Sequence, residues 1–264
     1  DPNNEFKRGG LADISFDRKN KTATVKISKR AKWSDGHPVV ARDLSFAYEI
    51  VANKAVGSSH YSEELENIEG MREYHNGTAD KISGLEEKDD KTLVIHFKKM
   101  KPTMTTTGSG YILESAEPYH YLKNVAMKDL VASDKLRKKP LFYGPFKIKK
   151  LVQGESIEWV PNTYYYKKPH IAKIIVETID NSKAVVAIKA GKFDVMLAQS
   201  PQIYNALKKD KDLVQLGKKT YYYSYMGFRV GKLDKDGNNV MDKHTPSSDR
   251  ALRQAMAYAM NVEQ

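Results

Sequence analysis

The chain of 264 residues contains no cysteine. This excludes disulfide bonds, thiolate chemistry and cysteine-based zinc sites. The sequence also lacks any apolar run close to the ~18 residues that a membrane-spanning helix requires. It opens Asp-Pro-Asn-Asn-Glu with no signal peptide, so we expect it to be a fragment of a longer protein. The absence of cysteine is compatible with a bacterial protein that works outside the cytoplasm.

The usual catalytic motifs are missing as well. There is no His-Glu-x-x-His and no Gly-x-Ser-x-Gly, and the seven histidines show no pairing at the i+2 to i+4 spacing typical of metal ligands. Residues 105–110 form a small-residue loop without the Gly-Lys-Ser/Thr end of a phosphate-binding loop, and 234–238 lacks the spacing of a calcium loop. We therefore predict a binding protein and not an enzyme, with no cofactor and no bound metal.

Positive charge is in excess. The formal net charge is +11, which by itself suggests a polyanion partner such as nucleic acid or an anionic polymer. The lysines are spread along the whole chain, however, in short runs beside expected strands or at helix ends. A solvated, lysine-rich surface is therefore favoured, and a basic nucleic-acid- or polyanion-binding domain stays as the alternative. That alternative predicts affinity that falls steeply with salt.

Enough apolar material is present for a core, since 40% of the residues are hydrophobic and 29% are charged. In the first half, alternation predicts strands around Ile14, over 23–27 and over 93–97. Trp33 is predicted to be a core residue, and Asp43 the N-cap of a helix. Composition and pattern predict four further segments. These are short helices over 63–69 and 71–75, one or two helical segments over 116–131, and a basic loop over 133–139.

The stretch 141–160 predicts a tight Gly144-Pro145 turn that leads into a two-stranded hairpin. After it, strands and helices alternate, which favours an α/β unit. The first expected elements are a buried strand region over 171–179, a helix that begins at Asp180–Ser182 and is stopped by Gly191, and an apolar strand over 193–197. A helix from Ser200-Pro201 through Leu207, an aromatic strand over 221–228 and a surface turn over 234–238 are expected next. The final helix is expected to be capped by Asp249 and to carry an apolar stripe that includes Leu252 and Met256.

Five segments in order resemble the bacterial oligopeptide-binding protein family, the extracytoplasmic solute-binding subunits (family 5) of ABC peptide importers. Trp33–Asp43 is similar to the family's WSDG-x-P-x-TA-x-D, and Tyr143-Gly144-Pro145-Phe146 to its GTGPY/F, with Tyr143 where threonine is usual. Asn162–Tyr166 resembles NPDYW, Ala190–Val195 resembles AGEIDI, and Arg250–Asn261 resembles D-x-RVRQALAYAIDR. Together these matches cover nearly the whole chain.

This resemblance implies an α/β fold with a periplasmic-binding-protein-like type II lobe, a mixed sheet with flanking helices, plus an α+β subdomain. Residues 1–140 would be the extra subdomain of the first lobe, 141–230 its main α/β part, and 231–264 the crossing segment and first helix of a second lobe that is largely missing. The ligand would lie against the tyrosine strand that crosses between the lobes. The residues implied as ligand contacts are Tyr223 and Tyr225, followed by Tyr222 and Phe228.

The resemblance also implies a function. An oligopeptide would be the ligand, hinge closure the mechanism, and the permease subunits of an ABC transporter the partner, with no nucleic acid. A monomeric, cell-surface lipoprotein of a Gram-positive bacterium is expected, attached to the membrane only through a lipid anchor outside this chain. Within the same broad family, a non-peptide solute such as nickel, haem or a sugar oligomer, or a signalling peptide, is the second alternative.

Overall fold

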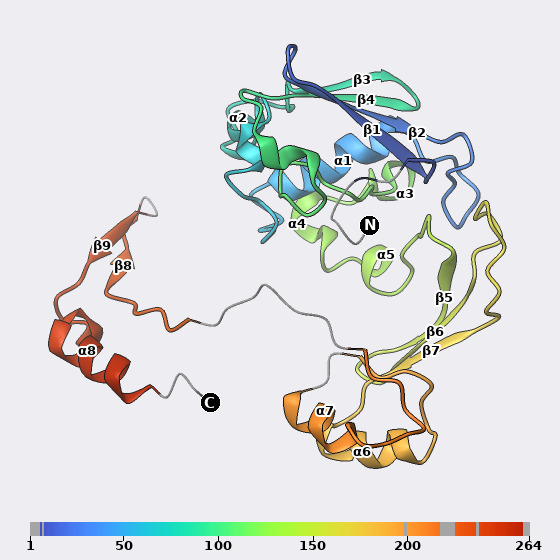
Figure 1. Ribbon diagram of the computed structural model, residues 1–264. Coiled ribbons are helices and arrows are strands. Elements are labelled where there is room, and N and C mark those ends of the chain that lie inside the picture. Colours follow the sequence, from blue (N-terminus) through green and yellow to red (C-terminus); the bar gives the residue numbers. More distant parts are fainter. Residues whose placement is uncertain (1–5, 7, 198–199, 217–224, 236–237, 261–264) are drawn as a thin grey trace. The chain divides into compact units, whose positions relative to one another are not determined.

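The structure is a computed structural model that describes residue 6 and residues 8–197, 200–216, 225–235 and 238–260 (Figure 1). The chain divides into two compact units, Asp1–Asp180 and Asn181–Gln264. The domain boundaries predicted at 140/141 and 230/231 come from the family resemblance and not from this division, and they stay predictions.

The first unit begins with a four-stranded antiparallel sheet of order β1-β2-β4-β3 (Figure 1). Its strands are β1 (Ala12–Asp17), β2 (Thr22–Ile27), β3 (Leu85–Asp89) and β4 (Thr92–His96). The alternation seen in the sequence has its expected effect, because Ala23, Leu93 and Ile95 are fully buried in one hydrophobic cluster. The predicted strands around Ile14, over 23–27 and over 93–97 are confirmed.

Helix α1 (Ala41–Ala52) packs on β3 and β4 and shares this core through Tyr48 and Ala52. The helix begins three residues earlier than predicted, with Val40 at the N-cap. Asp43 is therefore not the N-cap: it lies at N3, and its carboxylate accepts a hydrogen bond from the Val40 backbone N–H at 3.0 Å. A glutamate at N3 reaches back in the same way in a capping box.

Short helices surround this core. They are the 3₁₀ turns η1 (Leu65–Asn67) and η2 (Pro102–Thr105) and the helices α2 (Met71–His75), α3 (Tyr119–Leu122), α4 (Met127–Leu130) and α5 (Asp134–Arg137). The basic loop predicted over 133–139 is wrong, because α5 lies inside it. The Ser133 hydroxyl accepts from the Leu136 backbone N–H at 3.4 Å, and this N-cap supports a helical turn that composition alone did not indicate.

A three-stranded antiparallel sheet of order β5-β6-β7 completes the first unit, with β5 (Phe146–Val152), β6 (Ser156–Pro161) and β7 (Ile174–Glu177). The predicted hairpin is confirmed, and Gly154 takes the left-handed φ of 77° in its turn. The buried strand predicted over 171–179 is wrong in its burial: Ile175 and Val176 of β7 are about half exposed. In the part of the chain that the structure describes, β7 lies at the edge of its sheet and pairs with β6 alone.

The second unit contains α6 (Asn181–Lys189), α7 (Pro201–Leu207), β8 (Gly231–Leu233), β9 (Asn239–Met241), the 3₁₀ turn η3 (Pro246–Ser248) and α8 (Arg250–Ala259). Helices α6 and α7 share a small core of Ala184, Ile188, Ile203 and Leu207. The strands β8 and β9 pair as a hairpin around the predicted surface turn.

Helix boundaries in this unit follow the sequence signals. Gly191, with φ of 67°, closes α6 in a Schellman motif: its N–H donates to the Ile188 carbonyl, and the Lys192 N–H donates to that of Ala187. Ser200 caps α7, and Asp249 caps α8 by accepting from the Ala251 N–H at 2.7 Å. These three predictions are confirmed.

The apolar strand predicted over 193–197 is not formed, since this segment has irregular backbone and Val195 and Leu197 are exposed. A short apolar run becomes a strand only where a sheet edge accepts it. Among the described residues of this unit, β8 and β9 pair with each other and leave 193–197 outside their ladder.

Candidate functional site

The residues predicted to contact a ligand are only partly described. Tyr222 and Tyr223 lie outside the described residues. Tyr225 is 80% exposed and Phe228 is half-buried, and both belong to a segment, 225–230, with irregular backbone and no strand pairing. The predicted aromatic strand is therefore absent over 225–228, and the assignment of these side chains to a ligand stays a prediction.

The segment Trp33–Asp43, by contrast, forms a well-defined polar and aromatic cluster in the first unit. Trp33 is 1% exposed, as predicted for a core residue, and lies edge-on to Tyr143 with ring centroids 5.1 Å apart. Its indole N–H donates to the Asp43 carboxylate at 2.8 Å. The tryptophan therefore anchors the turn 33–37 to the start of α1.

Asp43 is a buried carboxylate, 1% exposed, that is satisfied from three directions. Besides the Trp33 indole, it accepts from the backbone N–H of Val40 at 3.0 Å and of Tyr119 at 2.9 Å. A buried charge is tolerated when it accepts several hydrogen bonds, because these replace the lost hydration. Asp43 thereby joins the turn 33–37, α1 and the first residue of α3.

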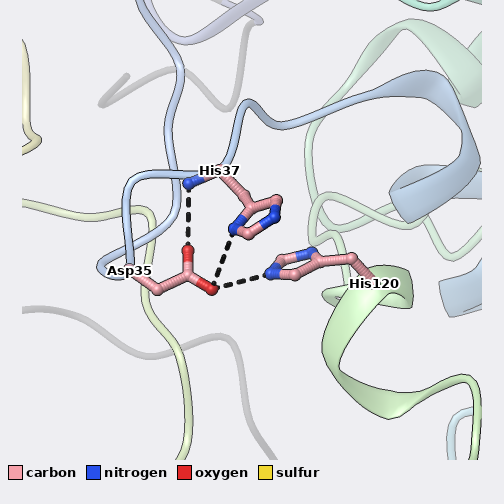
Figure 2. A group of neighbouring side chains, drawn as sticks. All are labelled: Asp35, His37 and His120. Carbon is pink, nitrogen blue, oxygen red and sulfur yellow. Dashed lines mark hydrogen bonds and ion pairs between the residues drawn. The ribbon is translucent and has the colours of Figure 1, made fainter.

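Asp35, His37 and His120 meet directly beside this anchor (Figure 2). The Asp35 Oδ2 lies 2.8 Å from His120 Nε2 and 3.3 Å from His37 Nδ1. The two imidazole rings are stacked, with centroids 4.1 Å apart and planes inclined by 17°. Asp35 Oδ1 accepts from the His37 backbone N–H at 3.0 Å, which holds the turn closed.

The electrostatics of Asp35 reflect these contacts. Partial burial acts to raise the pKa of its carboxyl group, but the hydrogen bond to His120, the His37 backbone N–H and the charges of both imidazoles outweigh that effect and lower the pKa below its usual value. The carboxylate is therefore ionised at neutral pH and is available as an anionic ligand.

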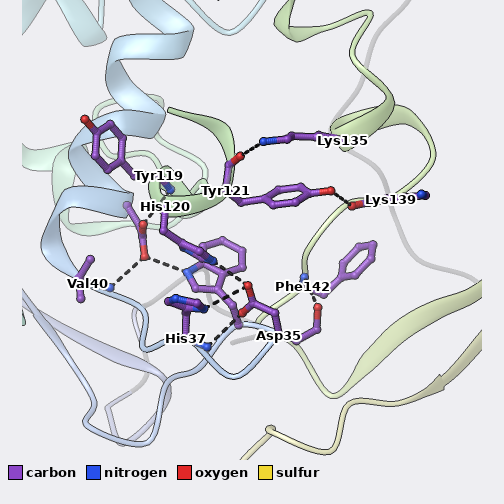
Figure 3. Close-up of polar contacts among 12 residues, drawn as sticks. Asp35, His37, Val40, Tyr119, His120, Tyr121, Lys135, Lys139 and Phe142 are labelled. Atoms are coloured by element: carbon purple, nitrogen blue, oxygen red, sulfur yellow. Dashed lines mark hydrogen bonds and ion pairs between the residues drawn. The ribbon is translucent and has the colours of Figure 1, made fainter. Parts of the chain in front are cut away.

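The sequence does not predict this group, because His37 and His120 are 83 residues apart, far outside the i+2 to i+4 spacing typical of paired metal ligands. The one sequence signal was that Asp35 and His37 are two apart in a turn next to a buried tryptophan. Figure 3 shows the position of the third member. His120 follows Tyr119 at the start of α3 and lies beside Asp35 and His37, near Val40.

The other motifs of the first unit converge on the same turn. The Ser34 hydroxyl accepts from the Phe142 N–H at 3.1 Å, and Asn162, 2% exposed, donates from its amide to the Gly144 carbonyl at 3.0 Å. A Cβ at Gly36 would lie 3.0 Å from the Tyr164 ring. The three segments that resemble family motifs in this unit, 33–43, 143–146 and 162–166, therefore contact one another and form one structural junction.

A chiefly apolar cavity of about 280 Å³ in the first unit shares Tyr143 with this junction. Its lining includes Leu11, Ile14, Val25, Leu44 and Tyr143. A site for a peptide backbone needs several convergent polar groups, so this cavity is a poor candidate for the predicted ligand.

Comparisons with known proteins identify the family to which this chain belongs. A family model described as bacterial extracellular solute-binding proteins, family 5 middle, matches residues 9–264. The chain belongs to this family. The oligopeptide-binding protein OppA of Lactococcus lactis subsp. lactis is 43% identical over 263 residues, which cover 98% of this chain and 44% of that protein.

Solved structures of family members agree. Lactococcal OppA complexed with an endogenous peptide in the closed conformation superposes with a TM-score of 0.94 and 42% identity over 100% of this chain and 50% of that one. Haemophilus influenzae OppA in complex with RPPGFSPFR gives a TM-score of 0.63 at 25% identity, covering 78% and 41% of the two chains. The predicted family and α/β fold class are confirmed, and the chain spans about half the length of the relatives it matches.

Family 5 consists of solute-binding proteins, which agrees with the prediction of a binding function. Over the described residues, every helix is too short or too polar to cross a bilayer.

Proposed function

We propose that this protein binds oligopeptides outside the cell and delivers them to the permease subunits of an ABC importer. The observation that carries the proposal is the 42% identity and TM-score of 0.94 to OppA holding an endogenous peptide, across the whole of this chain. The relatives at 42–43% identity are oligopeptide-binding proteins, which favours this function over a nucleic-acid binder or a binder of nickel, haem or sugar.

The proposed mechanism is closure of two lobes around an extended peptide, with no chemical step and hence no catalytic residue. Backbone hydrogen bonds to the peptide would supply affinity for any sequence, and roomy pockets would tolerate different side chains. In this scheme 1–140 is the extra subdomain of the first lobe, 141–230 its main part and 231–264 the entry to the second. A lipid anchor outside this chain would hold the monomeric protein at the cell surface.

The proposal assigns ligand contacts to Tyr223 and Tyr225, then to Tyr222 and Phe228. Tyrosine suits this role, because its ring offers apolar area and its hydroxyl a hydrogen bond at low entropic cost. Of the proposed contacts that the structure describes, Tyr225 exposes most of its side chain, as a ligand contact requires.

Calorimetry with mixed tri- to octapeptides tests the proposal, with this chain and the full-length protein compared at low and moderate salt. We expect the full-length protein to bind with little salt dependence and this chain to bind weakly. In the full-length protein, Tyr225→Ala should weaken binding by about 1–2 kcal/mol, whereas Tyr258→Ala, which removes another exposed tyrosine, should not. Failure of the full-length protein to bind any peptide, together with salt-sensitive binding to DNA or RNA, would contradict the proposal.

A further inference from the structure

We propose that Asp35, His37 and His120 form a binding site for a divalent first-row transition-metal ion, with zinc as the ion to test first. Their ligand atoms all lie within 4.8 Å of one another. None of the three residues is among the proposed peptide contacts, and the inference does not depend on peptide binding.

The distances fit a metal polyhedron. Zinc binds imidazole nitrogen and carboxylate oxygen at about 2.0–2.2 Å, which places neighbouring ligand atoms about 2.9–3.5 Å apart for angles between 90° and 109°. The Asp35 oxygen lies 2.8 Å from His120 Nε2 and 3.3 Å from His37 Nδ1. Because the imidazole rings of His37 and His120 are stacked with planes inclined by 17°, at least one ring must rotate before both nitrogens can face a single ion.

The donor set selects the class of ion. Two imidazoles and one carboxylate suit zinc, copper, nickel or iron, whereas calcium and magnesium prefer sites made of oxygen atoms alone. The carboxylate supplies one negative charge against the two positive charges of the ion. Three protein ligands leave a fourth tetrahedral position for water, as in zinc sites that stay open to solvent.

The surrounding structure holds the ligands in place before any ion arrives. Asp43 receives hydrogen bonds from Trp33 and from the Tyr119 N–H, so one buried carboxylate positions both the turn that carries Asp35 and His37 and the helix that carries His120. Such outer contacts orient metal ligands and contribute to affinity. Random surface histidines lack this support.

The site is also accessible. The side chain of His37 is 60% exposed, and those of Asp35 and His120 are 31% and 25% exposed. An ion can therefore enter from solvent. Substitution of His37 removes little buried surface, whereas the side chains of Asp35 and His120 are mostly buried, so the stability of each variant is compared with and without metal.

The competing explanation is a hydrogen-bonded group that only fastens the turn 33–37 to α3. The two explanations differ in what the residues do with zinc. A fastening role predicts that substitutions change stability equally with and without metal. A metal site predicts that they remove the stabilisation that zinc provides, because an ion that binds only the folded state stabilises it by an amount that rises with the logarithm of its affinity.

The decisive experiment is calorimetric titration of the chain with Zn²⁺ in the presence of a weak competing chelator. We expect one zinc per chain, and a loss of affinity of about tenfold or more in His120→Ala and in Asp35→Asn. Asp35→Asn keeps a side-chain oxygen for the His37 backbone N–H, so the turn should persist. His60→Ala is the matched control, because His60 is exposed and lies outside the cluster.

Thermal unfolding with and without Zn²⁺ gives a second readout. Zinc should raise the Tm of the wild-type chain and of His60→Ala, and should raise it less in His37→Ala and His120→Ala, whatever their Tm without metal. Mg²⁺ at the same concentration should have no such effect. Equal zinc affinity in His120→Ala and His60→Ala, or no binding by the wild-type chain, would overturn the proposal.

Discussion

Helices α1 and α8 have similar apolar periodicity but opposite surroundings. In α1, seven residues are buried, among them Phe46, Ala47 and Tyr48. In α8, no residue is buried, and the apolar stripe that includes Leu252 and Met256 stays about 40% exposed. An apolar stripe therefore predicts a helix in both units, but only a facing sheet or helix turns that stripe into a core.

The same contrast holds for the two units as wholes. The first unit contains three clusters of buried residues, whereas the described part of the second contains one, the small core between α6 and α7. Val214 and Leu216 are almost fully exposed. Packing should therefore decide stability in the first unit, and local backbone signals such as caps and left-handed glycines in the second.

Removal of apolar volume should separate the units most strongly. Leu93→Ala deletes a fully buried side chain in β4 and should lower the free energy of unfolding of the first unit by about 2–5 kcal/mol. Leu252→Ala in α8 should cost less than about 1 kcal/mol, because its side chain is partly solvated already.

Both tryptophans, Trp33 and Trp159, belong to the first unit, so urea unfolding followed by tryptophan fluorescence measures that unit. Amide hydrogen exchange in α8 measures the second. A larger effect of Leu252→Ala than of Leu93→Ala, each in its own unit, would break the comparison.

Loss of a carboxylate should show the next largest difference. Asp43→Asn places an NH₂ group against one of three buried N–H donors and should destabilise the first unit by about 2–3 kcal/mol. Asp249→Asn at the exposed N-cap of α8 should change stability by about 0.5 kcal/mol or less, because asparagine caps helices nearly as well.

The same two measurements apply to this pair. A cost below 1 kcal/mol for Asp43→Asn would show that the buried network does not hold the turn 33–37, and would weaken the argument for a preorganised ligand set there.

Substitution of a glycine by alanine should show the smallest difference in stability cost between the two units. Gly36→Ala combines a φ of 95° with a Cβ placed 3.0 Å from the Tyr164 ring, so it should cost about 2 kcal/mol or more. Gly191→Ala meets nothing within 4 Å and should cost about 1 kcal/mol from its left-handed φ of 67° alone. Equal costs, measured as above, would show that packing around Gly36 adds nothing.

Much of the fold was predictable because its signals are local. The alternation in β2 and β4, the Schellman glycine of α6 and the cap of α8 depend on neighbours within a few residues. The helix missed over 134–137 and the early start of α1 were errors about local caps, whereas two other failures concerned context. The strand expected over 193–197 and the buried face expected of β7 both needed a partner that the sequence does not reveal.

The candidate sites divide in the same way. By themselves, the residues of the chain determined its family, the strands around Ile14, over 23–27 and over 93–97, and the buried position of Trp33, because ordered motifs and short-range periodicity carry that information. Only the tertiary structure decided that Asp35, His37 and His120 meet. Their proximity depends on how the buried carboxylate of Asp43 joins two segments far apart in the chain, and no local pattern encodes such a long-range contact.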